Sequence, residues 1–197
     1  MISAICRLAR LAGLTLAGGL LLATANGASA GPVMDAAAQA ESLLGTGKSA
    51  DALTAFDQVT DAAWAALPFQ FRNILLVDQV SGYGRYQPHQ GSTYKAGDTP
   101  VIYFEPVGYG FGDVDGLSRI GIRTGLEIRT PGGLVLAKTE DFGELEWKGL
   151  AKSHEFYGSL SVALPDIRPG NYQLIVTVTD EASGKTTAAT LFFDIAA

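Results

Sequence analysis

The chain has 197 residues, enough for one ordinary domain with a smaller module beside it. Hydrophobic residues make up 47% and charged residues 17%, a composition that excludes a wholly disordered chain. The formal net charge of −6 argues against a nucleic-acid partner, because proteins of that class present a basic surface to phosphates.

Residues 1–30 are predicted to be a signal peptide. Two arginines precede the apolar run 11–25, and Ala28-Ser29-Ala30 supplies the small residues that a signal peptidase accepts. The run is short for a membrane span, which takes roughly 20 apolar residues, and an uncleaved anchor is the alternative. Cleavage before Gly31 would remove Cys6, the only cysteine, and with it any disulfide or thiolate ligand. The predicted location is periplasmic or extracellular, with no membrane span after cleavage.

Residues 31–68 are predicted to form a short helical hairpin. Gly45-Thr46-Gly47 interrupts an alanine-rich stretch, and Ser49 suits the N-cap of a second helix that Pro68 would end. Trp64 is predicted to pack on the next domain, and contact with a partner is the alternative. The apolar face of the second helix is expected to consist of Ala52, Phe56, Val59, Ala63 and Leu67.

This spacing has a parallel in a known family. Gly47-Lys48, followed by Ala52, Phe56 and Val59, resembles the turn and second helix of a tetratricopeptide repeat. The resemblance covers one unit of about 34 residues, whereas arrays of this kind need about three repeats. A peptide-binding groove and an ordinary helical hairpin both remain open.

Residues 69–197 are predicted to form a β-domain of seven strands, because the hydrophobic period changes to two. Pro131-Gly132-Gly133 is expected to make a tight turn between two strands, whereas the glycine-rich segment 81–86 reads as a loop or a bulged edge. The clearest inward face is formed by alternate residues, Ile120, Ile122, Thr124, Leu126 and Ile128.

The segment Pro169-Gly170-x-Tyr172-x-Leu174-x-Val176 resembles the corner before strand F of immunoglobulin-like and fibronectin type III-like domains. The resemblance implies that the Tyr172 hydroxyl bonds to backbone just upstream. Leu174 stands where antibody domains carry a cysteine, so no inter-sheet disulfide is expected. Residues 94–105 also resemble a segment of β-sandwich domains of bacterial exported proteins. The fold class that follows is α+β, with a short N-terminal helical hairpin followed by an antiparallel immunoglobulin-like β-sandwich.

The sequence predicts no catalytic residue, no cofactor and no metal, and the chain is predicted not to be an enzyme. His89 and His154 are both expected on the solvated surface, whereas a zinc site takes three or four ligands. No serine lies in a nucleophile elbow. Asp113 and Asp115 form a fragment of a calcium loop, but Thr124 stands where the loop needs its glutamate. Calcium binding there and a solvated turn both remain open.

The candidate ligand-binding residues are Tyr83, Tyr86, Tyr109 and Phe111, which lie in a glycine-rich third of the chain. Exposed aromatic rings can stack on sugars or anchor a protein, although packing beneath loops is the alternative. Residues 140–147 interleave acidic and aromatic side chains and read either as a contact strip or as a solvent face. The predicted function is non-enzymatic binding or an envelope-associated interaction, with a protein or a cell-envelope glycan as partner. The alternative is a carbohydrate-binding module-like protein that uses the loop tyrosines.

Overall fold

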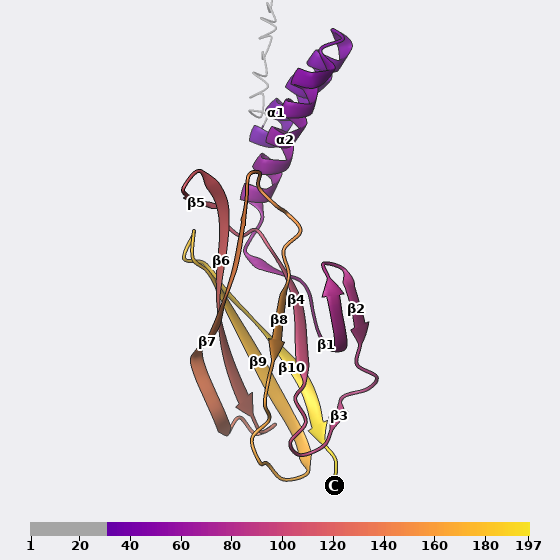
Figure 1. Cartoon of the computed structure of the whole chain (residues 1–197), viewed down its shortest axis with the longest axis vertical. Helices are drawn as coiled ribbons and strands as arrows, with labels where there is room; N and C mark the ends of the chain where they lie inside the picture. Colours follow the sequence, from indigo (N-terminus) through magenta and orange to yellow (C-terminus); the bar gives the residue numbers. More distant parts are fainter. Residues whose placement is uncertain (1–30) are drawn as a thin grey trace, which may run out of the picture. The chain divides into compact units, whose positions relative to one another are not determined.

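The computed structural model describes residues 31–197, so the predicted signal peptide lies outside the described residues. None of the helices described is both long and apolar enough to cross a membrane. The elements are shown in Figure 1 and follow in this order: α1 (Pro32–Gly45), α2 (Ser49–Ala66), β1 (Gln70–Gly82), β2 (Arg85–Pro88), β3 (Thr93–Tyr94), β4 (Val101–Val107), β5 (Gly112–Val114), β6 (Leu117–Arg129), β7 (Val135–Gly149), β8 (Gly158–Ser161), β9 (Gly170–Asp180) and β10 (Thr186–Ile195).

Local signals explain where the two helices begin and end. α1 begins at Pro32, whose fixed backbone angle suits the first helical position. Between the helices Gly47 takes a φ of 74°, and the Thr46 hydroxyl donates a hydrogen bond to a carbonyl at the end of α1. α2 ends at Ala66, because Pro68 disfavours helical geometry in the residue before it and Leu67 is extended.

The buried face of α2 differs from the predicted one. Ala52 and Ala55 are buried and pack toward Ala40 of α1, whereas Phe56 is 43% exposed and Leu67 is 37% exposed. The separation of two helices depends on the size of the side chains at their contact. Alanines bring α1 and α2 close together, so the bulky Phe56 lies at the margin of the contact. The prediction that Phe56 lies on the buried face is wrong.

Two sheets share one hydrophobic core. The smaller sheet has the strand order β2-β1-β4-β8, and the larger has β3-β10-β9-β6-β5 with β7 also paired to β6. Fully burying one large apolar side chain contributes about 1.5–3 kcal/mol, so side chains that both sheets direct inward dominate the stability. The largest of these are Ile102, Phe104, Ile120, Ile122, Leu174, Val176, Val178 and Phe193.

The structure confirms the inward face predicted for β6. Its alternate residues from Ile120 to Ile128 are all buried. Thr124, the one polar member, donates its hydroxyl to the carbonyl of Gly143 at 2.8 Å, which satisfies its hydrogen-bonding group inside the core. The predicted turn after β6 is also present, because the N–H of Gly133 donates to the carbonyl of Thr130 at 2.9 Å.

Tyr172 makes the hydrogen bond expected of it. Its buried ring stacks on Phe193, with ring centroids 5.6 Å apart, and its hydroxyl donates to the carbonyl of Arg168 at 2.6 Å. The bond joins the connection before β9, which carries Arg168, to Tyr172 on the strand. A single hydrogen bond does not establish a family, and the immunoglobulin-like resemblance remains a prediction at this point.

The predicted fold class, α+β with an antiparallel immunoglobulin-like β-sandwich after the helices, is wrong. Strand residues far outnumber helical residues between 31 and 197, so the described chain is mostly β. The larger sheet is mixed, because β3 runs parallel to β10, with Thr93 opposite Asp194. Ten strands are present in residues 31–197 where the sequence predicts seven. The difference arises because glycine-rich segments that read as loops form the short strands β2, β3 and β5.

Candidate functional site

The structure divides the four predicted ligand-binding residues into two groups. Tyr83 and Tyr86 lie at the β1–β2 hairpin, where their hydroxyls accept hydrogen bonds from Arg72 at 2.8 Å and from Asn73 at 2.7 Å. Tyr86 also packs on Tyr103, with ring centroids 4.4 Å apart. These two tyrosines therefore pair with side chains of the smaller sheet and do not join the other two predicted residues.

Tyr109 and Phe111 lie in the connection between β4 and β5, which touches the end of α2. Gly108, directly before Tyr109, has a φ of 72°, a conformation that favours glycine. A Cβ at Gly108 would lie 2.4 Å from the carbonyl oxygen of Pro68, far inside normal contact distance. The lack of a side chain at Gly108 thus allows Tyr109 to reach the C-terminal end of α2.

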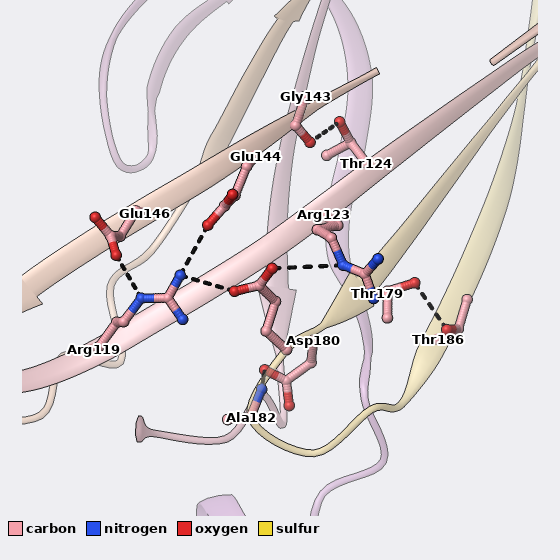
Figure 2. Close-up of polar contacts among 11 residues, drawn as sticks. Arg119, Arg123, Thr124, Gly143, Glu144, Glu146, Thr179, Asp180, Ala182 and Thr186 are labelled. Atoms are coloured by element: carbon pink, nitrogen blue, oxygen red, sulfur yellow. Dashed lines mark hydrogen bonds and ion pairs between the residues drawn. The ribbon is translucent and has the colours of Figure 1, made fainter. Parts of the chain in front are cut away.

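A buried carboxylate holds the other side of this connection. Asp180 at the end of β9 is fully buried and accepts hydrogen bonds from the N–H groups of Gly110 at 2.9 Å and Ser183 at 3.1 Å. Figure 2 shows its further bond to the N–H of Ala182, at 3.4 Å. A buried carboxylate needs such donors, because they replace its lost hydration. Asp180 therefore ties the β9–β10 turn to the segment that carries Tyr109 and Phe111.

We call the side chains around Tyr109 the junction cluster: Asp61, Trp64, Tyr109, Phe111, Lys152 and His154. Trp64 of α2 donates its indole N–H to the carbonyl of Tyr109 at 2.9 Å, and the two ring centroids are 4.9 Å apart. The Tyr109 hydroxyl donates to the carbonyl of Ser153 at 2.8 Å. Three segments distant in sequence meet in this cluster: the end of α2, the β4–β5 connection and the β7–β8 connection. The packing role predicted for Trp64 is confirmed.

An ion pair and a histidine provide the polar part of the junction cluster. Lys152 Nζ lies 2.5 Å from Asp61 Oδ2 and 5.6 Å from the centre of the Phe111 ring. His154 packs edge-on against Trp64, with ring centroids 4.5 Å apart. Its buried Nε2 lies 3.8 Å from Asp61 Oδ1 and has no hydrogen-bond partner among the described residues. Burial lowers the pKa of His154, an effect that Asp61 opposes and Lys152 reinforces, so the imidazole is neutral at pH 7.

Two cavities lie beside the Lys152–Asp61 pair. The first has a volume of about 300 Å³ and a lining that includes three aromatic residues and two lysines: Trp64, Tyr109, Phe111, Lys152 and Lys185. The second, of about 370 Å³, lies on the side of His154 and is lined equally by polar residues of α2 and by the β7–β8 connection. Aromatic faces can stack on a ring-shaped ligand, and ammonium groups attract an anion. The first cavity combines both features in a chain that is otherwise acidic.

A second polar cluster surrounds Arg119 on β6 (Figure 2). Its guanidinium lies 2.8 Å from Glu144, 2.5 Å from Glu146 and 2.8 Å from Glu181, and Arg123 lies 3.5 Å from Glu181. The hydrogen bond from Arg119 lowers the pKa of Glu146, with a further contribution from Lys148. The predicted acidic strip at 140–147 is thus partly neutralised by basic residues, and it belongs to strand β7.

The remaining candidate ligands do not assemble into a site. His89 Nδ1 lies 2.6 Å from Asp78, and its ring stacks on Tyr94 at 4.4 Å. Asp113 accepts a hydrogen bond at 3.3 Å from a backbone N–H in the β5–β6 turn. Across residues 31–197, no group of three or more histidine, cysteine or acidic residues is placed to hold a metal ion. The prediction that both histidines are solvated is wrong, because the side chains of His89 and His154 are only 19% and 25% exposed.

Sequence reasoning did not find the pairing of Asp61 with Lys152. The two residues are 91 positions apart, and each lies among ordinary surface residues in the sequence. The single usable signal was Trp64, an aromatic residue off the expected helix face.

No protein-family model matches the chain, and no curated protein matches it. Among the solved structures that match is the Pseudomonas fluorescens alkylpurine DNA glycosylase AlkC bound to DNA containing an abasic site analog. It is 10% identical, with a TM-score of 0.35, and the match covers 71% of this chain. It covers 33% of the glycosylase chain, so the matched region spans about a third of that protein.

Two exclusions predicted from the sequence are corrected, because an enzyme bound to DNA is among the matching structures. The first is that the chain is not an enzyme, and the second is that it has no nucleic-acid partner. Neither exclusion is kept. A TM-score of 0.35 carries no argument about the fold or activity of this chain, so neither glycosylase activity nor DNA binding is assigned to it.

Proposed function

We propose that this chain is an exported binding protein, acting in the periplasm or outside the cell, and that the junction cluster holds its ligand. The export part rests on residues 1–30, where a basic start, an apolar run and small residues precede Gly31. The binding part rests on the cavity of about 300 Å³, which falls at the lower end of the range typical of small-ligand sites.

The ligand class that fits this cavity is a carbohydrate that carries a carboxylate. Phe111 is only partly buried, so one face of its ring can pack against the C–H groups of a sugar. Lys185 can pair with a carboxylate, and Lys152, which is already paired with Asp61, can donate a further hydrogen bond to the ligand. Asp61 can accept hydrogen bonds from hydroxyl groups. The observation that carries the proposal is this placement of two lysines beside an aromatic wall.

Isothermal titration calorimetry with the chain from Gly31 onward tests the ligand class. Glucuronate and galacturonate are compared with glucose and galactose, which lack the carboxylate. We expect Phe111→Ala to weaken binding of the sugar acids roughly tenfold or more, as for a central aromatic contact. Lys185→Gln should reduce the preference for the acids over the neutral sugars. Lys95→Gln, which removes an exposed lysine elsewhere, is the matched control.

Two outcomes would contradict the proposed site. If Tyr83→Ala and Tyr86→Ala abolish binding while Phe111→Ala does not, the ligand lies on the smaller sheet. If acid and neutral sugars bind equally and Lys185→Gln changes neither, the lysines play no part in recognition. Export has its own test, because N-terminal sequencing of secreted protein should begin at Gly31, and a start at Met1 would contradict it.

A further inference from the structure

The two helices expose an unusual share of the apolar side chains of the described chain. Between residues 31 and 197, ten large hydrophobic side chains are exposed. Five of them lie on α1, on α2 or directly after α2. The exposed fractions are 67% for Met34, 49% for Leu44, 67% for Leu53, 43% for Phe56 and 37% for Leu67.

Four exposed residues of α2 form a regular stripe. Leu53, Phe56, Thr60 and Ala63 follow one another at steps of three and four residues, and the exposed Leu67 comes directly after the helix. Alternating steps of three and four residues keep side chains close to one line along a helix, as in the seam between two packed helices. The contact of α2 with α1 uses a different line, through Ala52 and Ala55. The stripe is therefore a second seam without a partner among the described residues.

α1 adds to the same side of the helix pair. A shallow groove between the helices is lined by Gln39, Leu43, Asp51, Thr54, Ala55 and Gln58, which marks one side of the pair. Successive helical residues are rotated by about 100°. Relative to Ala40, which faces α2, this rotation places Leu44 and Met34 on the side opposite to Leu43. The same rotation places Leu53 and Phe56 opposite to the groove, so both helices present apolar residues on one face.

The charge of the helix pair indicates which kind of partner this face can bind. Residues 31–67 hold five acidic residues and one lysine, a net charge of −4. Asp51 lines the groove and Asp61 is paired with Lys152, which leaves Asp35, Glu41 and Asp57 against Lys48. A second copy of the chain would bring the same negative charge to the contact, and a membrane of anionic lipid would be repelled likewise. We infer that this face binds an amphipathic helix of a partner protein, with an apolar stripe flanked by lysine and arginine.

Fluorescence anisotropy with a defined peptide tests this inference on the chain from Gly31 onward. The probe is a labelled synthetic helix of about 18 residues, or five turns, with leucines at steps of three and four and lysines on both flanks. We expect saturable binding that weakens as salt rises. The double change Leu53→Gln with Phe56→Gln should lower the affinity at least about tenfold. Both residues are exposed, so the fold should tolerate the change.

The matched control is Leu134→Gln with Leu136→Gln, which removes two exposed leucines at the start of β7 and beside it. Phe111→Ala is a second control, because it disrupts the proposed ligand site and should leave peptide binding unchanged. Equal binding of a peptide with glutamates in place of the lysines would overturn the inference. So would sedimentation with anionic phospholipid vesicles, or a dimer in analytical ultracentrifugation that the Leu53 and Phe56 changes dissociate.

Discussion

Replacing Gly108 with alanine tests whether the close approach of the β4–β5 connection to the end of α2 stabilises the fold. Gly108 has a φ of 72°, and a left-handed conformation costs an L-residue about 1–2 kcal/mol. The new Cβ would also lie 2.4 Å from the carbonyl oxygen of Pro68. Overpacking of this kind costs about 1–3 kcal/mol, which brings the expected destabilisation to about 2–5 kcal/mol.

Gly184→Ala separates the two contributions. Gly184 has a nearly identical φ of 71°, but a Cβ there would meet nothing within 4 Å. We therefore expect only the backbone cost of about 1–2 kcal/mol, slightly reduced in both variants because alanine also restricts the unfolded chain.

Urea unfolding followed by circular dichroism measures both variants. For a chain of this size each kcal/mol also corresponds to about 2–4 °C in Tm, so thermal unfolding gives a second reading. Equal losses in the two variants would refute the reasoning, because the contact with Pro68 would then contribute nothing. A larger loss at Gly184 would refute it as well.

Three further predictions concern single polar groups. Tyr172→Phe removes the hydrogen bond to a carbonyl four residues upstream and should cost about 1 kcal/mol in urea unfolding, whereas an unchanged midpoint would show the bond to be without effect. The folded pKa of His154 lies below its usual value. The stability linked to this group is therefore present above about pH 6.5 and is lost as the pH falls through the folded pKa. NMR titration of His154 should show this low midpoint, and Asp61→Asn should lower the midpoint further. The pKa of Glu146 is also lowered, by Arg119, so stability should decrease as the pH falls below about 4.5, and Glu146→Gln should flatten that decrease in acid urea titrations.

Local patterns in the sequence predicted the parts of the fold that depend on local chemistry. The alternation along β6 follows from the burial of one face of the strand. The Tyr172 hydrogen bond spans only four residues. The helix break at 45–47 likewise follows from two glycines. These features could be predicted because each is determined within about one turn or one strand pair.

The candidate site depends on long-range contacts and could not be predicted in the same way. Asp61 meets Lys152 only because α2 ends where the β7–β8 connection passes, and nothing near either residue signals the other. Tyr83 and Tyr109 looked equivalent in the sequence, yet one pairs with Arg72 and the other is buried against Trp64. Aromatic composition predicted that rings gather in this third of the chain, but not which of them share a cavity.

The burial of three tyrosines gives the protein an absorbance signal that reports whether its fold is intact. Burial raises the pKa of Tyr94 to about 12, and it raises the pKa values of Tyr103 and Tyr109 well above the usual range. At about pH 11 a freely exposed phenol is largely ionised, whereas these three are expected to remain protonated in the native chain. Phenolate absorbance from Tyr109 at that pH would therefore appear only in molecules whose contact between α2 and the β4–β5 connection has opened. Because the chain has seven tyrosines, the part of the alkaline absorbance that Tyr109→Phe removes is the label-free measure of that opening.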